Sequence, residues 1–272
     1  MDAKNLAIGV FDSGMGGLTV LSALQAHLPN ESFVYLGDTA RLPYGTKSPD
    51  TVKHYAMQMA RILIERRIKA LVIACNTATT AALPHLQKML PEIPVLGVVA
   101  PGAAAAVAAT KNQRIAVLAT ETTIASKAYH DLIIEQLPKA FISSRACSVL
   151  VALAEEGMVN NAIAREALKH YLADIKDEDA VLLGCTHFPV FKDLLLSLLP
   201  PGVTIVDSAQ ATALALHNTL SSQNLMADAT SEAPKINYLV TDSVKRFQAV
   251  GEIFLGKKLV ATDIELVDAM PG

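Results

Sequence analysis

Two stretches, Leu71–Thr80 (LVIACNTATT) and Ala180–Val190 (AVLLGCTHFPV), share one form: an apolar run ends at a cysteine and small polar side chains follow at once. Four or five aliphatic residues in a row are typical of a strand buried on both faces, as in parallel sheets covered by helices. Cys75 and Cys185 would then lie at the carboxyl ends of their strands, where ligands bind in open α/β sheets. Two thiols placed alike predict one site with two similar reactive groups.

The segments around these stretches alternate between strand and helix patterns, and the pattern begins again near residue 113. Asp12, in the polar turn after the first strand, precedes Cys75 by nearly as many residues as Thr120, in a second polar turn, precedes Cys185. Each turn is followed by an apolar-periodic helix. The expected strand, turn and helix are Leu6–Phe11, Asp12–Gly17 and Leu18–Leu28 in the first half, and Arg114–Ala119, Thr120–Thr123 and Ile124–Leu137 in the second.

These repeats predict an α/β fold of two pseudo-symmetric three-layer domains with mostly parallel sheets and a site in the cleft between them. A late strand and helix, Ile236–Thr241 and Ser243–Leu255, have no partner unit of their own and are expected to pack on the first half. The predicted domains are residues 1–97 plus 208–272 and residues 98–207. The polar segment Ser221–Pro234 is predicted to be a surface loop.

Composition excludes several classes of protein. The 272 residues include 23 Lys and Arg against 26 Asp and Glu, a net charge of −3, which offers no broad positive field for nucleic acid. No segment reaches the roughly 18 apolar residues of a membrane span, and the first residues lack the form of a signal peptide. Three cysteines without an export signal favour reduced thiols in the cytoplasm.

Two thiols in one site are suited to inverting a carbon acid. One base removes a proton from one face of the carbon, and the conjugate acid of the second base returns a proton to the opposite face. A thiol with a pKa of about 8.5 is only slightly ionised at pH 7, so helix N-termini and hydrogen-bond donors must favour the thiolate. Asp12 and His187, the ionisable residues of the polar turns, are the candidate proton-handling partners.

Simpler interpretations stand beside this one. The glycines after the first strand resemble a dinucleotide-binding turn, but Thr19 takes the last glycine position of that motif, so no NAD is expected. A zinc site is not expected, because Cys185 and His187 have no partner at CxxC or HxxxH spacing. Cys147 shows no polar cluster and fits a buried apolar residue. Asp12 would also suit a helix N-cap, and His187 a packed core histidine.

Six motifs in order, FDSGMGG, GDTARLPYG, IACNTATT, VLATETTIASKAY, LLGCTHFP and VDSA, closely resemble the cofactor-independent glutamate racemases of the aspartate/glutamate racemase superfamily. The resemblance covers essentially the whole chain. It implies that Cys75 takes the α-proton of D-glutamate and Cys185 that of L-glutamate, assisted by Asp12 and His187. It also implies no cofactor, no metal and a role in supplying D-glutamate for peptidoglycan.

The same resemblance assigns positions that hold the amino acid. Glu155 matches a family glutamate near the site, but Ser148 and Ala152 replace prolines of the family pattern around it, and Ala119 replaces a glycine before Thr120. The implied substrate-binding residues are Ser13, Tyr44, Gly45, Asn76, Thr77, Thr120 and Thr186. None is an arginine or lysine, so the substrate carboxylates would be held by backbone amides, hydroxyls and the Asn76 amide.

Other functions remain open at this point. A related racemase would act on aspartate or a hydantoin, whereas a related decarboxylase of malonates would keep a single cysteine. A two-lobed amino-acid receptor would bind the same ligand without reaction. The sequence leaves the oligomeric state open, a homodimer included.

Overall fold

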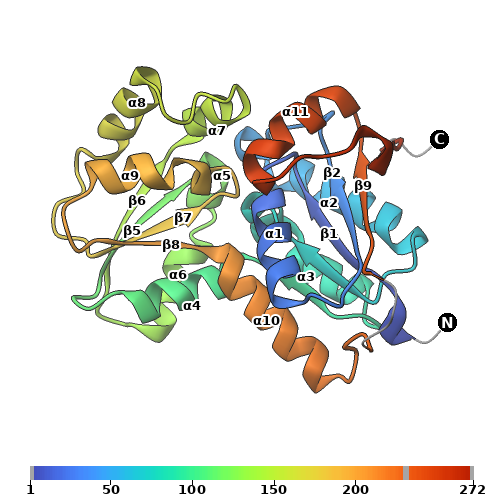
Figure 1. Ribbon diagram of the computed structural model, residues 1–272. Helices are drawn as coiled ribbons and strands as arrows, with labels where there is room; N and C mark the ends of the chain where they lie inside the picture. Colours follow the sequence, from blue (N-terminus) through green and yellow to red (C-terminus); the bar gives the residue numbers. More distant parts are fainter. Residues whose placement is uncertain (1–2, 229–232, 270–272) are drawn as a thin grey trace.

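The computed structural model describes residues 3–228 and 233–269, which form two parallel β-sheets, each with helices on both faces (Figure 1). The first sheet has six strands in the order β10-β9-β2-β1-β3-β4, and the second has four in the order β6-β5-β7-β8. The strands are β1 Ile8–Asp12, β2 Phe33–Gly37, β3 Ala70–Ile73, β4 Val95–Gly97, β5 Arg114–Ala119, β6 Phe141–Ala146, β7 Ala180–Gly184, β8 Thr204–Asp207, β9 Ile236–Val240 and β10 Ile264–Leu266.

Helices bury the apolar side chains of both sheet faces. α2 and α3 pack on one face of the first sheet, and α1 and α11 pack on the other. In the second sheet, α4 and α6 cover one face and α7, α8 and α9 the other. The helices are α1 Leu18–His27, α2 Pro49–Glu65, α3 Asn76–Met89, α4 Val99–Ala109, α5 Glu121–Ala125, α6 Ala128–Gln136, α7 Ser148–Glu155, α8 Ala162–Leu172, α9 Lys192–Leu198, α10 Ser208–Ser222 and α11 Val244–Leu255, with 3-10 turns at Ala3–Asn5, Tyr44–Thr46, Phe188–Phe191 and Ala261–Asp263.

The second sheet repeats the central strand order of the first. The order β6-β5-β7-β8 corresponds to β2-β1-β3-β4, and the strand pairs in both runs are parallel. Cys75 follows β3 after one residue and Cys185 follows β7 directly, so the two cysteines stand after equivalent strands. The predicted α/β fold with two related parallel sheets is confirmed.

The end of the chain returns to the first sheet. β9 pairs in parallel with β2, with Ile236 opposite Phe33, and β10 extends the sheet beyond β9. α10 packs against both α1 and α4, and so lies between helices of the two sheets. The domain boundaries at residues 97/98 and 207/208 stay a prediction. Of the predicted loop at 221–234, Ser221 and Ser222 belong to α10, and residues 229–232 lie outside the described ones.

Some predicted element boundaries are wrong. The expected continuous helix Ile124–Leu137 is two helices, α5 and α6, because Lys127 between them has a left-handed backbone (φ 58°). The apolar-periodic pattern after Cys75 predicts a helix over residues 79–90. That helix, α3, begins instead at Asn76, since Cys75 already acts as its N-cap. Pro101 is of a residue type that often begins a helix and is expected to do so. It is instead the third residue of α4, which begins at Val99.

A buried ion pair joins Lys69, just before β3, to Glu31, shortly before β2. Lys69 Nζ lies 2.5 Å from Glu31 Oε2, both side chains are at most 1% exposed, and Glu31 Oε1 accepts a bond from the Ala227 N–H at 2.8 Å. We expect Lys69→Met to lower the free energy of unfolding by about 3–5 kcal/mol, because Glu31 would keep an unpaired buried charge. The matched variant Lys53→Met, whose pair with Asp50 is exposed, should change it by less than about 0.5 kcal/mol. Urea denaturation measures both, and equal effects would contradict the assignment.

Within residues 3–228 and 233–269, no helix is both long enough and apolar enough to cross a membrane.

Candidate active site

Segments at the carboxyl ends of the two sheets line one small cavity of about 20 Å³. That volume holds about one water molecule, so an amino acid enters only if the cavity widens. Two lining residues, Pro43 and Val151, were not predicted. The predicted residues that line it are Ser13, Tyr44, Gly45, Cys75, Asn76, Thr77, Thr120, Cys185, Thr186 and His187.

Cys75 occupies the N-cap of α3. Its Sγ accepts a bond from the Ala78 N–H at 3.4 Å and is also hydrogen-bonded by Ser13. Burial and the nearby Asp12 charge outweigh these bonds and raise the pKa of the Cys75 thiol to about 12. The thiol is therefore neutral at pH 7 in this closed state. A positive charge brought to the cavity would favour the thiolate.

Cys185 belongs to a buried chain of polar groups. His187 Nδ1 lies 3.9 Å from Cys185 Sγ, and His187 Nε2 lies 2.9 Å from Glu155 Oε1. Burial disfavours the imidazolium, but the bonds to Cys185 and Glu155 outweigh it and raise the pKa of His187 to about 10. His187 is therefore a cation at neutral pH that touches the second thiol. Phe254 of α11 packs its ring against the His187 ring, with the centroids 5.1 Å apart.

Asp12 lies behind the cavity wall at the end of β1. Its Oδ2 accepts a bond from the Gly14 N–H at 3.0 Å, and its Oδ1 accepts one from Thr186 Oγ1 at 3.2 Å. Burial raises the pKa of Asp12, and the His187 charge opposes that rise. A Cβ on Gly16 would stand 2.4 Å from His187 Nδ1, so a glycine there lets the Asp12 turn approach His187 closely.

Polar side chains of α3 meet those of α5 and α6. Thr77 Oγ1 lies 2.8 Å from Thr120 Oγ1 and 3.1 Å from Thr123 Oγ1, which forms a buried triangle of hydroxyls. Asn76 Oδ1 accepts a bond from the Tyr129 hydroxyl at 2.6 Å. Within the described part of the chain, Asn76 Nδ2 is buried without a hydrogen-bond partner. An unsatisfied buried donor at a cavity is suited to a carboxylate.

Tyr44 and Gly45, which line the cavity, also form hydrogen bonds with other residues. The Tyr44 hydroxyl donates to Asp38 Oδ2, and its ring is buried beside that of Tyr55. The Gly45 carbonyl accepts a bond from Thr122 Oγ1 at 3.0 Å, which links the 3-10 turn of the first sheet to α5 of the second. Sequence reasoning did not identify Thr122, because a threonine one residue into a helix carries no particular signal.

Cys147 is fully buried, and its Sγ donates to the Arg145 carbonyl at 3.5 Å. It does not line the cavity. Among the residues that the structure describes, no group of three or more His, Cys, Asp or Glu side chains is arranged to hold a metal ion.

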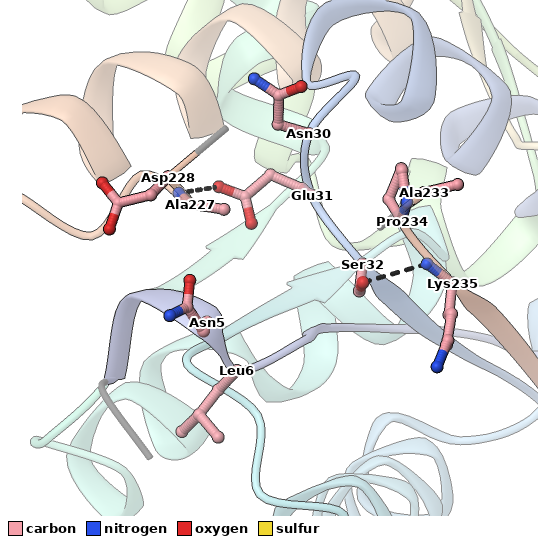
Figure 2. Close-up of a pocket in the computed structure, with 10 residues that line it drawn as sticks. All are labelled: Asn5, Leu6, Asn30, Glu31, Ser32, Ala227, Asp228, Ala233, Pro234 and Lys235. Carbon is pink, nitrogen blue, oxygen red and sulfur yellow. Dashed lines mark hydrogen bonds between the residues drawn. The ribbon is translucent and has the colours of Figure 1, made fainter. Parts of the chain in front are cut away.

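A larger polar cavity of about 420 Å³ lies in the first-sheet half, between Glu31, Ser32 and the segments near Ala227 and Lys235 (Figure 2). Its hydrogen bonds join the backbone N–H of Ala227 to Glu31 and that of Lys235 to Ser32 Oγ. Of the residues that the structure describes, no cysteine, histidine or threonine lines it. The smaller cavity, with its two thiols and an imidazolium, is therefore the candidate active site.

Comparison with known proteins assigns the family. The model of the family Asp/Glu/Hydantoin racemase matches residues 18–216. A glutamate racemase of Geobacter metallireducens is 45% identical over 255 residues, which cover 93% of this chain and 94% of that one. The crystal structure of a Francisella tularensis glutamate racemase in complex with D-glutamate superimposes with a TM-score of 0.90, at 36% identity and 98% coverage of both chains. A Bacillus anthracis glutamate racemase gives a TM-score of 0.91 at 38% identity, covering 97% of this chain and 98% of that one. The chain therefore belongs to the Asp/Glu/hydantoin racemase family.

Proposed function

We propose that this enzyme interconverts L- and D-glutamate without a cofactor, using Cys75 and Cys185 as the two bases. The observation that carries the proposal is the placement of two thiols, after equivalent strands of two related sheets, on the wall of one small cavity. The relatives named glutamate racemase, and the solved relative that holds D-glutamate, support glutamate as the substrate.

The reaction exchanges one proton for another at the α-carbon. The thiolate of one cysteine takes the α-proton and becomes a thiol, and the electron pair of the broken C–H bond stays on the substrate. The thiol of the second cysteine then gives its proton to the opposite face of the carbanion and becomes a thiolate. Cys75 acts as the base on D-glutamate and Cys185 as the base on L-glutamate, so each reaction prepares the enzyme for the reverse one.

The two thiols differ in the charge that the protein places beside them. His187, a cation with a pKa of about 10, touches Cys185. Cys75 has only neutral donors in the structure, from Ala78 and Ser13. The α-ammonium group of the bound substrate would supply the missing positive charge, so ionisation of Cys75 is favoured only when substrate is present.

The substrate carboxylates would be held by neutral donors. The Asn76 Nδ2 group, the hydroxyls of Thr77, Thr120 and Thr186, and Ser13 line the cavity. The 14-residue helix α3 begins at Asn76, and its N-terminus favours a negative group there. Each hydrogen bond to a charged group contributes about 1.5–3 kcal/mol, so several suffice for a small dianion.

Proton NMR of L-glutamate in deuterium oxide tests the proposal. The α-proton signal should disappear with enzyme, and circular dichroism should show the optical signal decay to zero. Exchange with aspartate in place of glutamate would favour the related racemase. Unchanged glutamate beside measurable glutamate binding would favour the receptor and refute the proposed function.

We expect kcat/KM to rise between pH 7 and pH 9 by up to about tenfold per pH unit. Burial raises the pKa of Cys75 to about 12, so its thiolate fraction grows with pH, while His187 keeps its proton up to a pKa of about 10. The two enantiomers have equal free energies, so both directions must show the same kcat/KM profile. Initial rates of each enantiomer by circular dichroism check this, and an optimum below pH 7 would contradict it.

We also propose that the enzyme works in the cytoplasm and supplies D-glutamate for peptidoglycan. The three free thiols support a reducing compartment.

A further inference from the structure

Tyr129 reaches across from the second-sheet half to a residue of the first. It is the second residue of α6, is 3% exposed, and donates from its hydroxyl to Asn76 Oδ1 at 2.6 Å. Asn76 is the first residue of α3 and lines the cavity. In the described residues, Asn76 is the only hydrogen-bond partner of the Tyr129 hydroxyl.

This bond decides which end of the Asn76 amide faces the cavity. The hydroxyl proton needs an acceptor, and only the amide oxygen provides one, so Oδ1 turns toward Tyr129. Nδ2, which has no other partner in the described residues, then remains for a ligand. In the flipped amide, Nδ2 would point at the phenol oxygen, the phenol proton would lose its acceptor, and the cavity would face an oxygen that repels carboxylates.

The surroundings of Tyr129 keep its hydroxyl neutral and fixed. Burial, with the nearby charges of Cys185 and Asp207, raises the pKa of the phenol, so it remains a donor. A Cβ on Gly102 would lie 3.0 Å from the hydroxyl, and one on Gly184 would lie 2.8 Å from the ring edge. The two glycines therefore leave room for the ring in one position, beside the strand that ends just before Cys185.

We propose that Tyr129 is a positioning residue for substrate binding: its hydroxyl fixes the Asn76 amide so that Nδ2 donates to a carboxylate of the bound amino acid. The inference rests on the proposed function for the identity of the ligand. Tyr129 does not line the cavity, so it acts through Asn76. The bond joins helices of the two sheet halves, so the amide is fixed only when both halves are in place.

A double-mutant cycle tests the inference. Tyr129→Phe, Asn76→Ala and the double variant would be compared with the unmodified enzyme by calorimetric titration with racemic glutamate, whose interconversion produces no net heat. Tyr129→Phe should raise Kd and KM by about threefold to tenfold and change kcat by less than about twofold. In the Asn76→Ala background, the same substitution should change Kd by less than about twofold, because the group it orients is absent.

The matched control is Tyr171→Phe, which removes a hydroxyl from α8 of the same sheet half, away from the cavity. It should leave Kd and KM unchanged. A Tyr129→Phe effect of equal size in both backgrounds would show that the hydroxyl acts independently of Asn76 and would overturn the inference. No effect in the unmodified background would also overturn it. Loss of both racemisation and binding in the unmodified enzyme would instead refute the proposed function.

Discussion

Replacing either Cys75 or Cys185 by alanine is expected to lower kcat for glutamate racemisation by at least about a thousandfold, within the range of a positioned acid or base. Each thiol serves as base in one direction and as acid in the other, so neither substitution spares one direction. Because the equilibrium constant between enantiomers is one, kcat/KM must fall equally for L- and D-glutamate. Circular dichroism measures this loss.

The two alanine variants should nevertheless differ in isotope exchange. Cys185→Ala retains the thiol that faces the α-proton of D-glutamate, so any residual exchange with deuterium oxide should be confined to the D-enantiomer. Cys75→Ala should confine it to the L-enantiomer. NMR of each pure enantiomer distinguishes the two cases, and exchange of both enantiomers by one variant would show that a single base reaches both faces.

Cys147→Ala is the matched control for these variants, because Cys147 is also buried but does not line the cavity. Its rate of racemisation should stay within about twofold of the unmodified enzyme. Its free energy of unfolding should fall only by the small amount expected for a smaller core side chain. Full activity in Cys75→Ala or Cys185→Ala would end the two-base assignment.

His187→Asn is expected to lower kcat by about a hundredfold to a thousandfold. The substitution removes the cation that touches Cys185 Sγ and leaves Glu155 without its 2.9 Å partner. KM should change less, because the carboxylate donors on α3 are untouched. The rise of kcat/KM with pH should then continue above pH 9, since no imidazolium is left to lose its proton.

His170→Asn provides the control, because His170 is exposed on α8 and does not line the cavity. It should keep the activity and pH profile of the unmodified enzyme. If His187→Asn retained full activity, the His187 charge would have no part in the reaction.

The sequence was most informative where buried strands meet polar residues. The long aliphatic runs before Cys75 and Cys185 identify buried strands directly, because a strand covered on both faces admits few other residues. Those runs predicted the two parallel sheets and the place of the two cysteines. Four of the other residues that line the cavity, Ser13, Tyr44, Gly45 and Thr120, were assigned only by the resemblance to the glutamate racemases. The roles of these residues stay predictions until the variants are measured.

The elements and contacts that the sequence did not predict were missed for physical reasons. No element was predicted between Pro138 and Ala180, yet β6, α7 and α8 lie there. β6 reads FISSRA and is largely exposed at a sheet edge, so it lacks an apolar run. The proposed function of Tyr129 depends on its contact with Asn76, which lies 53 positions earlier in the chain. Spacing along a sequence does not reveal such a contact.

The return of β9 to the first sheet has a consequence for biosynthesis. β2 is completed only when residues 236–240, about two hundred positions later in the chain, pair with it. On the ribosome, the segment that builds the second sheet emerges whole before that partner exists. A nascent or truncated chain that ends before β9 would expose β2 as an open edge, a template for aggregation. Emergence of residues 236–266 is therefore the step at which a nascent chain gains protection from misassembly.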